Sequence, residues 1–163
     1  MSATEDLLRN NAAYAGSFTK ADASKPPAKK VAVLACMDAR LDPARALGLE
    51  EGDAHVIRNA GGVVTDDAIR SLAISQHELG TEEIVLIHHT DCGVLGFSDE
   101  QFADRLEREA GTRPDWAPIG FADIDEDVRR SIRRIRESPF LPRTGAVRGF
   151  VYEVETGRLR EVA

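Results

Sequence analysis

Two short apolar runs constrain the fold of this chain more than any other feature. Each run is followed by a cysteine or a histidine, residue types that can bind a metal ion. Residues 31–35 (VAVLA) and 84–88 (IVLIH) are rich in β-branched residues and lack the alternation of a half-exposed strand. Such runs are typical of strands in a parallel sheet covered on both faces. The first run leads into Cys36, and the second into His89. Ligands bind beyond the carboxyl ends of parallel strands, so a functional site is expected there.

The rest of the chain predicts strands and helices that alternate along the sequence. Besides those two runs, strands are expected at residues 54–58, 147–154 and 159–162, and helices at residues 2–14, 65–80, 99–110 and 121–137. This order favours one α/β domain over residues 1–163, with a mostly parallel central sheet flanked by helices.

Composition and charge exclude several classes of protein. A formal net charge of −7 offers no electrostatic basis for binding nucleic acid or an anionic membrane. No apolar stretch approaches the roughly 20 residues of a membrane-spanning helix. The first residues are acidic and polar, unlike a signal peptide, and two cysteines do not make a disulfide scaffold. We therefore expect a cytoplasmic protein.

Both cysteines and one histidine are expected at the same edge of the sheet. Neighbouring strands lie about 4.8 Å apart, and zinc with bonds of about 2.0–2.3 Å spans that gap. His89 and Cys92, spaced H-x-x-C, can turn inward from one loop, and Cys36 can reach across from the other strand. Three ligands leave a fourth position open, as in catalytic zinc sites. The alternatives are two cysteines buried as small hydrophobes, or a disulfide between them.

Asp38 and Arg40 follow Cys36 at intervals of two residues, so all three face the same side in an extended segment. Asp38 could become a fourth metal ligand. Arg40 could instead hold Asp38 off the metal through a bidentate pair, leaving Asp38 to accept a hydrogen from the zinc-bound hydroxide. The alternative is an ordinary surface ion pair.

The segment R-N-A-G-G ends the expected second strand and contains no phosphate-binding fingerprint. Paired glycines allow close approach of the backbone, so this turn is predicted to form a wall of the substrate pocket. The pocket residues expected are Asn59, Ala60, Gly61 and Gly62.

The remaining histidines are not expected to bind metal. His55 and His77 are predicted to lie on the surface of a strand and a helix. His88 precedes His89 in a strand and should therefore point to the opposite face of the sheet.

In order and spacing, C-M-D-A-R, R-N-A-G-G and H-T-D-C-G resemble the β-class carbonic anhydrases over about residues 31–96, and the short chain resembles their compact bacterial members. The resemblance implies a homodimer or homotetramer whose N-terminal helix packs on a neighbouring subunit. It also implies one Zn²⁺ per subunit on Cys36, His89 and Cys92. Asp38 and Arg40 would form the family's dyad, and in some members the aspartate itself binds zinc at lower pH.

The reaction implied by the resemblance is the reversible hydration of CO2 to bicarbonate and a proton, by attack of zinc-bound hydroxide on CO2. Two thiolates cancel the charge of Zn²⁺, so activity is expected to rise into the alkaline range. The alternatives are a zinc hydrolase of the same fold acting on CS2 or COS, and a non-catalytic zinc or bicarbonate sensor. A thiol redox protein is disfavoured because C-x-x-C spacing is missing.

Overall fold

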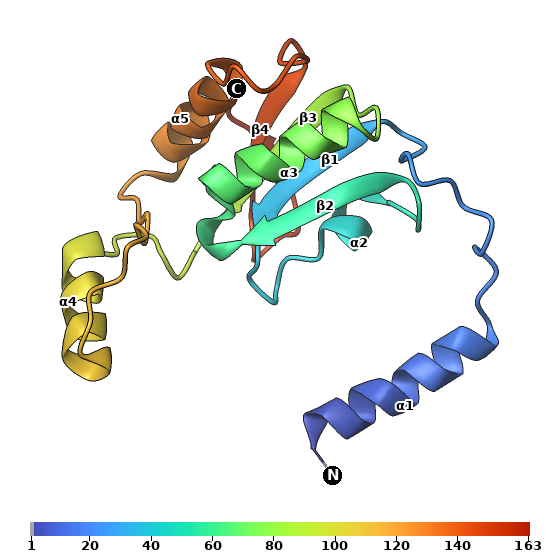
Figure 1. Cartoon of the computed structure of the whole chain (residues 1–163), viewed down its shortest axis with the longest axis horizontal. Coiled ribbons are helices and arrows are strands. Elements are labelled where there is room, and N and C mark those ends of the chain that lie inside the picture. The colour runs from blue at the N-terminus through green and yellow to red at the C-terminus, as the bar shows by residue number, and fades with distance from the viewer. Residues whose placement is uncertain (1) are drawn as a thin grey trace.

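The computed structural model describes residues 2–163, which contain a five-stranded sheet with some of the helices packed against its faces (Figure 1). In chain order the elements are α1 (Ala3–Gly16), β1 (Val31–Cys36), α2 (Pro43–Leu47), β2 (Ala54–Asn59), the 3-10 helix η1 (Ala60–Gly62), α3 (Asp66–His77), β3 (Glu83–His89), α4 (Asp99–Ala110), α5 (Ile124–Arg136), β4 (Val147–Tyr152) and β5 (Leu159–Glu161). The predicted α/β fold class is confirmed.

The strand order is β2-β1-β3-β4-β5, and only β5 runs antiparallel to its neighbour. The interior strand β1 is buried along its length except at its first residue, as expected from its unbroken apolar run. In the pairing of β1 with β3, Ala35 lies opposite Ile87. The carboxyl ends of these two strands therefore meet at the same edge of the sheet.

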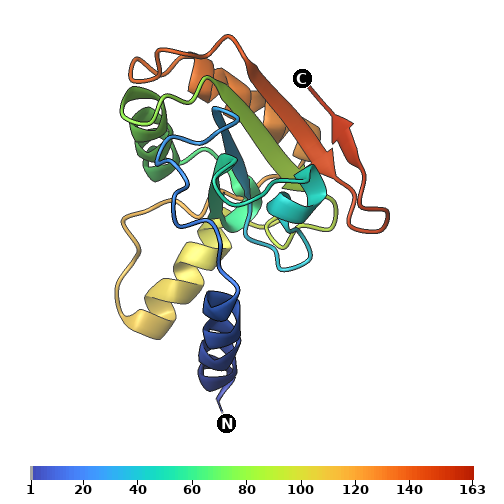
Figure 2. The same ribbon diagram turned by 90° about the vertical axis from the view of Figure 1, so that its right-hand side faces the viewer.

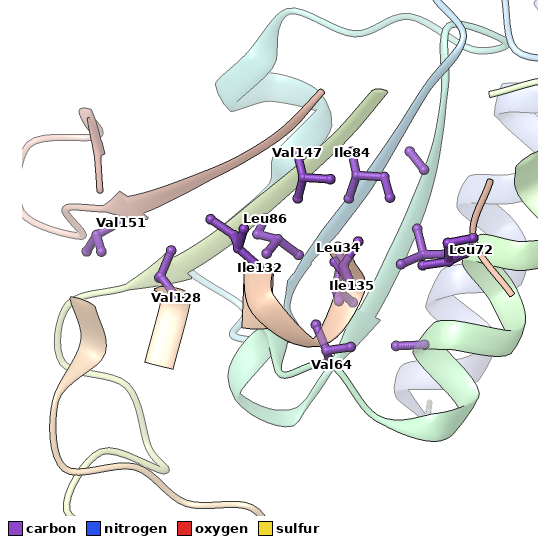
Figure 3. Close-up of a cluster of buried hydrophobic side chains, with 13 residues drawn as sticks. Leu34, Val64, Leu72, Ile84, Leu86, Val128, Ile132, Ile135, Val147 and Val151 are labelled. Carbon is purple, nitrogen blue, oxygen red and sulfur yellow. The ribbon is translucent and has the colours of Figure 1, made fainter. Parts of the chain in front are cut away.

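Helices α3 and α5 cover one face of the sheet and bury the larger apolar cluster (Figure 3). Leu34 of β1 and Leu86 of β3 point toward these helices and meet Leu72 of α3 and Ile132 of α5. Burying a side chain of this size contributes about 1.5–3 kcal/mol. The alternate strand residues, such as Val33 and Ile87, face the opposite cluster, which contains the two cysteines.

Capping side chains account for where the longer helices begin. Thr65 accepts a hydrogen bond from the backbone N of Ala68 at 3.1 Å and so starts α3. Asp123 caps α5 through the backbone N of Glu126 at 2.9 Å, so this helix begins at residue 124 rather than at the predicted residue 121. The bounds predicted for α4 agree with the structure.

Two short helices, α2 and η1, were not predicted. Helix α2 is capped by Asp42, carries Pro43 in its first turn and ends at Gly48 in the left-handed conformation, with a φ of 64°. These are recognisable signals, but five residues are too few to produce an apolar period. The 3-10 helix contains Gly61 with a φ of 79°, a conformation that favours glycine.

Helix α1 extends away from the sheet (Figures 1 and 2). Within Ala3–Gly16 no residue is buried, and Leu7 and Leu8 are 67% and 65% exposed. Across residues 2–163, no helix combines the length and the apolar character needed to cross a bilayer.

Gly149 in β4 allows α5 to lie close to the sheet. A Cβ atom at this position would overlap Val128 Cγ1 and lie 2.9 Å from Ile132 Cδ1. We therefore expect Gly149→Ala to destabilise the fold by about 1–3 kcal/mol through overpacking, measured as a lower midpoint of urea unfolding. Gly145→Ala is the matched control, because nothing lies within 4 Å of a Cβ atom there. Equal midpoints for the two variants would contradict this account of the packing.

Candidate metal centre

Cys36, His89 and Cys92 converge at the end of the β1–β3 pair. Cys36 is the last residue of β1, His89 is the last residue of β3, and Cys92 lies in the turn that follows β3. Their possible ligand atoms all lie within 4.8 Å of one another, and all three residues are buried. The two sulfur atoms are 4.0 Å apart, and both cysteines are free.

The orientation of His89 leaves one ring nitrogen available to a ligand. Its Nδ1 lies 2.9 Å from the carbonyl oxygen of Thr90, which fixes Nδ1 as the protonated nitrogen and leaves a lone pair on Nε2. Nε2 is buried and has no hydrogen-bond partner among the described residues. This buried nitrogen, which lacks a hydrogen-bond partner, lies beside two sulfur atoms. One imidazole nitrogen and two cysteine sulfurs are donors of the kind that Zn²⁺ prefers. These residues therefore fit a zinc ion.

The Cys36 and Cys92 sulfur atoms are close enough to hydrogen bond to each other, and this contact shifts the pKa values of the two thiols in opposite directions. Hydrogen bonding from Cys92 lowers the pKa of Cys36, with a smaller contribution from His89, although burial opposes the change. The same shared hydrogen bond, together with burial, raises the pKa of Cys92. Burial lowers the pKa of His89, but the Cys36 sulfur and the Thr90 carbonyl outweigh it and the net change is a rise. One thiolate therefore forms readily at this centre.

Asp38 and Arg40 form a multiply hydrogen-bonded pair at the exposed side of the cluster. The Asp38 carboxylate accepts from Arg40 Nε at 3.0 Å, Nη2 at 2.8 Å and the backbone N at 2.8 Å. Asp38 Oδ2 lies 3.7 Å from His89 Nε2, so the carboxylate borders the possible metal position. The Arg40 hydrogen bonds hold the pKa of Asp38 well below its usual range.

Arg58 contributes to the site in a way that sequence reasoning missed. Its Nε donates to the carbonyl of Cys36 at 3.0 Å, and its Nη2 donates at 2.7 Å to the carbonyls of Asp38 and of Leu41. Arg58 thus fixes the backbone that follows β1. The position of Arg58 in β2, opposite Ala35 of β1, is a signal that appears only once the strand register is known.

The R-N-A-G-G segment lies directly behind the cysteine of β1. Gly61 and Gly62 are buried, and a Cβ atom on Gly62 would lie 2.8 Å from the backbone N of Cys36 and 2.9 Å from the carbonyl of Ile87. Asn59 donates from Nδ2 to the carbonyl of Val63 at 2.8 Å, while Ala60 is exposed. Gly62 thus packs closely against the backbone of β1 and β3, where a larger residue would not fit, and a role of the segment in a substrate pocket remains a prediction.

The other histidines lie outside the cluster. His88 faces α5, where its Nε2 lies 2.7 Å from the buried carboxylate of Asp127. His55 on β2 contacts the Ser75 hydroxyl at 2.7 Å, and His77 is exposed on α3.

Comparisons with known proteins agree with this geometry. The family model described as carbonic anhydrase matches residues 31–116, the segment that contains every residue of the cluster. β-Carbonic anhydrase 1 of Mycobacterium tuberculosis is 56% identical over 162 residues, which is 99% of each chain. The chain belongs to the β-carbonic anhydrases.

A solved structure and a more distant relative extend the comparison. The crystal structure of carbonic anhydrase from Streptococcus mutans matches this β-carbonic anhydrase fold with a TM-score of 0.93 and 45% identity, covering 100% of this chain and 99% of that one. A carbon disulfide hydrolase of Acidithiobacillus thiooxidans is 37% identical over 156 residues, 83% of this chain and 78% of the relative.

The hydrogen bonds of Arg40 generate a prediction about Asp38 in the zinc-free protein. We expect Arg40→Ala to raise the pKa of the Asp38 carboxyl toward its ordinary value, as measured by carbon-13 NMR titration, while Arg148→Ala at the far end of β4 leaves it unchanged. Because the pKa is lower in the folded than in the unfolded chain, the pair stabilises the fold above about pH 4. That stabilisation is lost as the pH falls through the folded-state pKa. The same titration curve in wild type and Arg40→Ala would contradict the role given to Arg40.

Proposed function

We propose that this chain catalyses the reversible hydration of CO2 to bicarbonate and a proton. The observation that carries the proposal is the buried Cys36, His89 and Cys92 cluster beside the Asp38–Arg40 pair, in a member of the β-carbonic anhydrases. A purely structural zinc site needs four ligands and has no use for a carboxylate held at its open side.

In this proposal Cys36, His89 and Cys92 hold one Zn²⁺ per subunit. When bound, the metal acts as a Lewis acid that makes a water molecule nucleophilic enough to attack CO2. The Thr90 carbonyl keeps the His89 ring in the tautomer that offers Nε2. Burial of the three side chains keeps competing water away from the ligand atoms.

Asp38 is proposed to accept a hydrogen bond from the attacking water and so to orient it, and Arg40 is proposed to hold Asp38 in place. Asp38 is an acceptor-only group at neutral pH, so it can take a hydrogen bond from that water and direct its lone pair toward CO2. Arg40 holds the Asp38 carboxylate through three donors. With the metal bound, these hydrogen bonds would restrain Asp38 from becoming a fourth ligand. Release of Asp38 from Arg40 would let the carboxylate replace water at the metal.

The segment Asn59, Ala60, Gly61 and Gly62 is proposed to support the substrate pocket from behind. The close packing of Gly62 against Cys36 and Ile87 supports this role, because a larger residue would push the ligand-bearing strand ends apart. The segment would thus set the shape of the space in which CO2 binds by keeping these strand ends close together.

We further propose a cytoplasmic homodimer or homotetramer. The exposed apolar side chains of α1, which extends away from its own sheet, support packing of this helix on a neighbouring subunit (Figure 2). The negative net charge supports the absence of nucleic-acid and anionic-membrane partners.

Metal content tests the ligand assignment. We expect about one zinc per subunit in the wild type and a large loss of zinc in His89→Ala and Cys92→Ser, because a site with two ligands binds zinc far more weakly. His77→Ala serves as the control, since this exposed histidine lies on α3. Zinc measured by mass spectrometry at wild-type levels in both ligand variants would contradict the assignment.

Stopped-flow CO2 hydration tests the activity. We expect zinc-dependent turnover that increases from neutral to alkaline pH, because two thiolate ligands cancel the charge of Zn²⁺ and weaken its effect on the acidity of water. Arg40→Ala should reduce kcat/KM about 10- to 100-fold without loss of zinc, whereas Arg148→Ala should match the wild type. A rate that does not change between acid and alkaline pH would contradict the mechanism.

A second candidate is hydrolysis of CS2 or COS at the same centre, favoured by the likeness to a carbon disulfide hydrolase. The higher identity to a β-carbonic anhydrase over the whole chain favours CO2. Bound zinc without CO2 hydration at either pH would favour the sulfur substrates or a sensor, and assays with CS2 and COS would separate those two.

A further inference from the structure

Asp91 accepts hydrogen bonds from a second edge of the Arg40 guanidinium, next to the edge that binds Asp38. Arg40 Nη1 donates to Asp91 Oδ2 at 2.7 Å, and Arg40 Nη2 donates to the Asp91 carbonyl oxygen at 2.9 Å. The adjoining edge of the same guanidinium, formed by Nε and Nη2, faces Asp38, so that Nη2 donates to both aspartates. The two aspartates therefore hold one rigid guanidinium along two adjoining edges.

The backbone conformation of Asp91 makes this double contact possible. Asp91 has a φ of 54°, a left-handed conformation that is uncommon outside glycine but is tolerated by aspartate. In this conformation both the side chain and the carbonyl of Asp91 reach the same guanidinium. Uncommon backbone conformations of this kind are retained where the surrounding structure requires them, and often at functional sites.

The space and the negative charge beside Arg40 show why its side chain needs the additional hydrogen bonds to Asp91. Arg40 borders a cavity of about 650 Å³ whose lining also includes Asp91, Glu153 and Glu155. The Arg40 side chain is 48% exposed, so it has room to turn toward those two glutamates. A single exposed ion pair is a weak restraint on a long side chain, whereas a network with several hydrogen bonds in fixed geometry is stronger.

We propose that Asp91 is a positioning residue that keeps Arg40 aligned with Asp38, and so keeps the Asp38 carboxylate directed at the metal centre. Asp91 immediately precedes Cys92, which couples the alignment of Arg40 to the turn carrying a proposed metal ligand. The role in catalysis rests on the proposed CO2 hydration, while the mechanical role is a property of the folded chain alone.

Two substitutions at position 91 separate the side-chain contact from the backbone conformation. Asp91→Gly accepts the left-handed φ but removes the carboxylate, and Asp91→Asn keeps an acceptor oxygen and also tolerates that φ. Glu161→Gln is the control, because Glu161 forms a two-bond pair with Arg148 that is remote from the centre. Each variant is compared with the wild type at equal zinc content.

The direct readout is hydrogen exchange of the Arg40 Nε–H in the zinc-free protein, followed by nitrogen-15 NMR and assigned by its disappearance in Arg40→Lys. We expect exchange to be about tenfold faster in Asp91→Gly, intermediate in Asp91→Asn and unchanged in Glu161→Gln. In the zinc-loaded protein, kcat and kcat/KM for CO2 should fall together, about three- to tenfold in Asp91→Gly and less in Asp91→Asn.

Unchanged exchange in Asp91→Gly would overturn the proposal. Loss of activity only in proportion to loss of zinc would also overturn it, because Asp91 would then act by folding the Cys92 turn. Absence of hydration by the wild type would instead contradict the proposed function, and the exchange measurement would still decide whether Asp91 positions Arg40.

Discussion

The parallel pairing of β1 with β3 is the constraint on which the rest of this structure depends. Both strands are buried on two faces, so neither can slip by one residue without turning its apolar side chains to the wrong layer. The pairing sets Ala35 opposite Ile87, and Cys36 and His89 follow at the adjoining strand ends. The turn after β3 then returns Cys92 to the same point, and a backbone hydrogen bond from Thr90 to Tyr152 of β4 fixes its first residue.

Polarity changes sharply across the centre. On its inner side, two free thiols and a histidine nitrogen without a hydrogen-bond partner are buried among apolar side chains, a setting that suits a metal ion. On its outer side, Asp38 accepts several donors and stays ionised at the edge of solvent. The two sulfur atoms and the histidine nitrogen are therefore shielded from bulk water, while the Asp38 carboxylate lies between them and solvent. Asp38 links the two sides, because its carboxylate lies 3.7 Å from His89 Nε2, and Arg40 holds that carboxylate in place.

Much of this could be predicted from the sequence, because the decisive signals are local. The apolar runs indicated β1 and β3, and the residues directly after them had to meet if the sheet was parallel. Contacts that depend on register or on loop conformation were not predictable in this way. Arg58 reaches the backbone after β1 only because it lies opposite Ala35, and Asp91 reaches Arg40 only through a left-handed turn.

The glycines of the R-N-A-G-G segment illustrate the same limit. Adjacent glycines indicate that another group comes close to the backbone, but they do not say whether that group is a ligand or the protein itself. In the structure, Gly62 approaches the backbone of Cys36 and Ile87.

The central claim is that two sulfurs and one imidazole from this sheet edge hold zinc and leave a position open. X-ray absorption at the zinc edge of the loaded wild-type protein tests it most directly. The account predicts two sulfur neighbours at about 2.3 Å and two nitrogen or oxygen neighbours at about 2.0–2.1 Å, one of them from an imidazole. A first shell with fewer than two sulfur neighbours would contradict it.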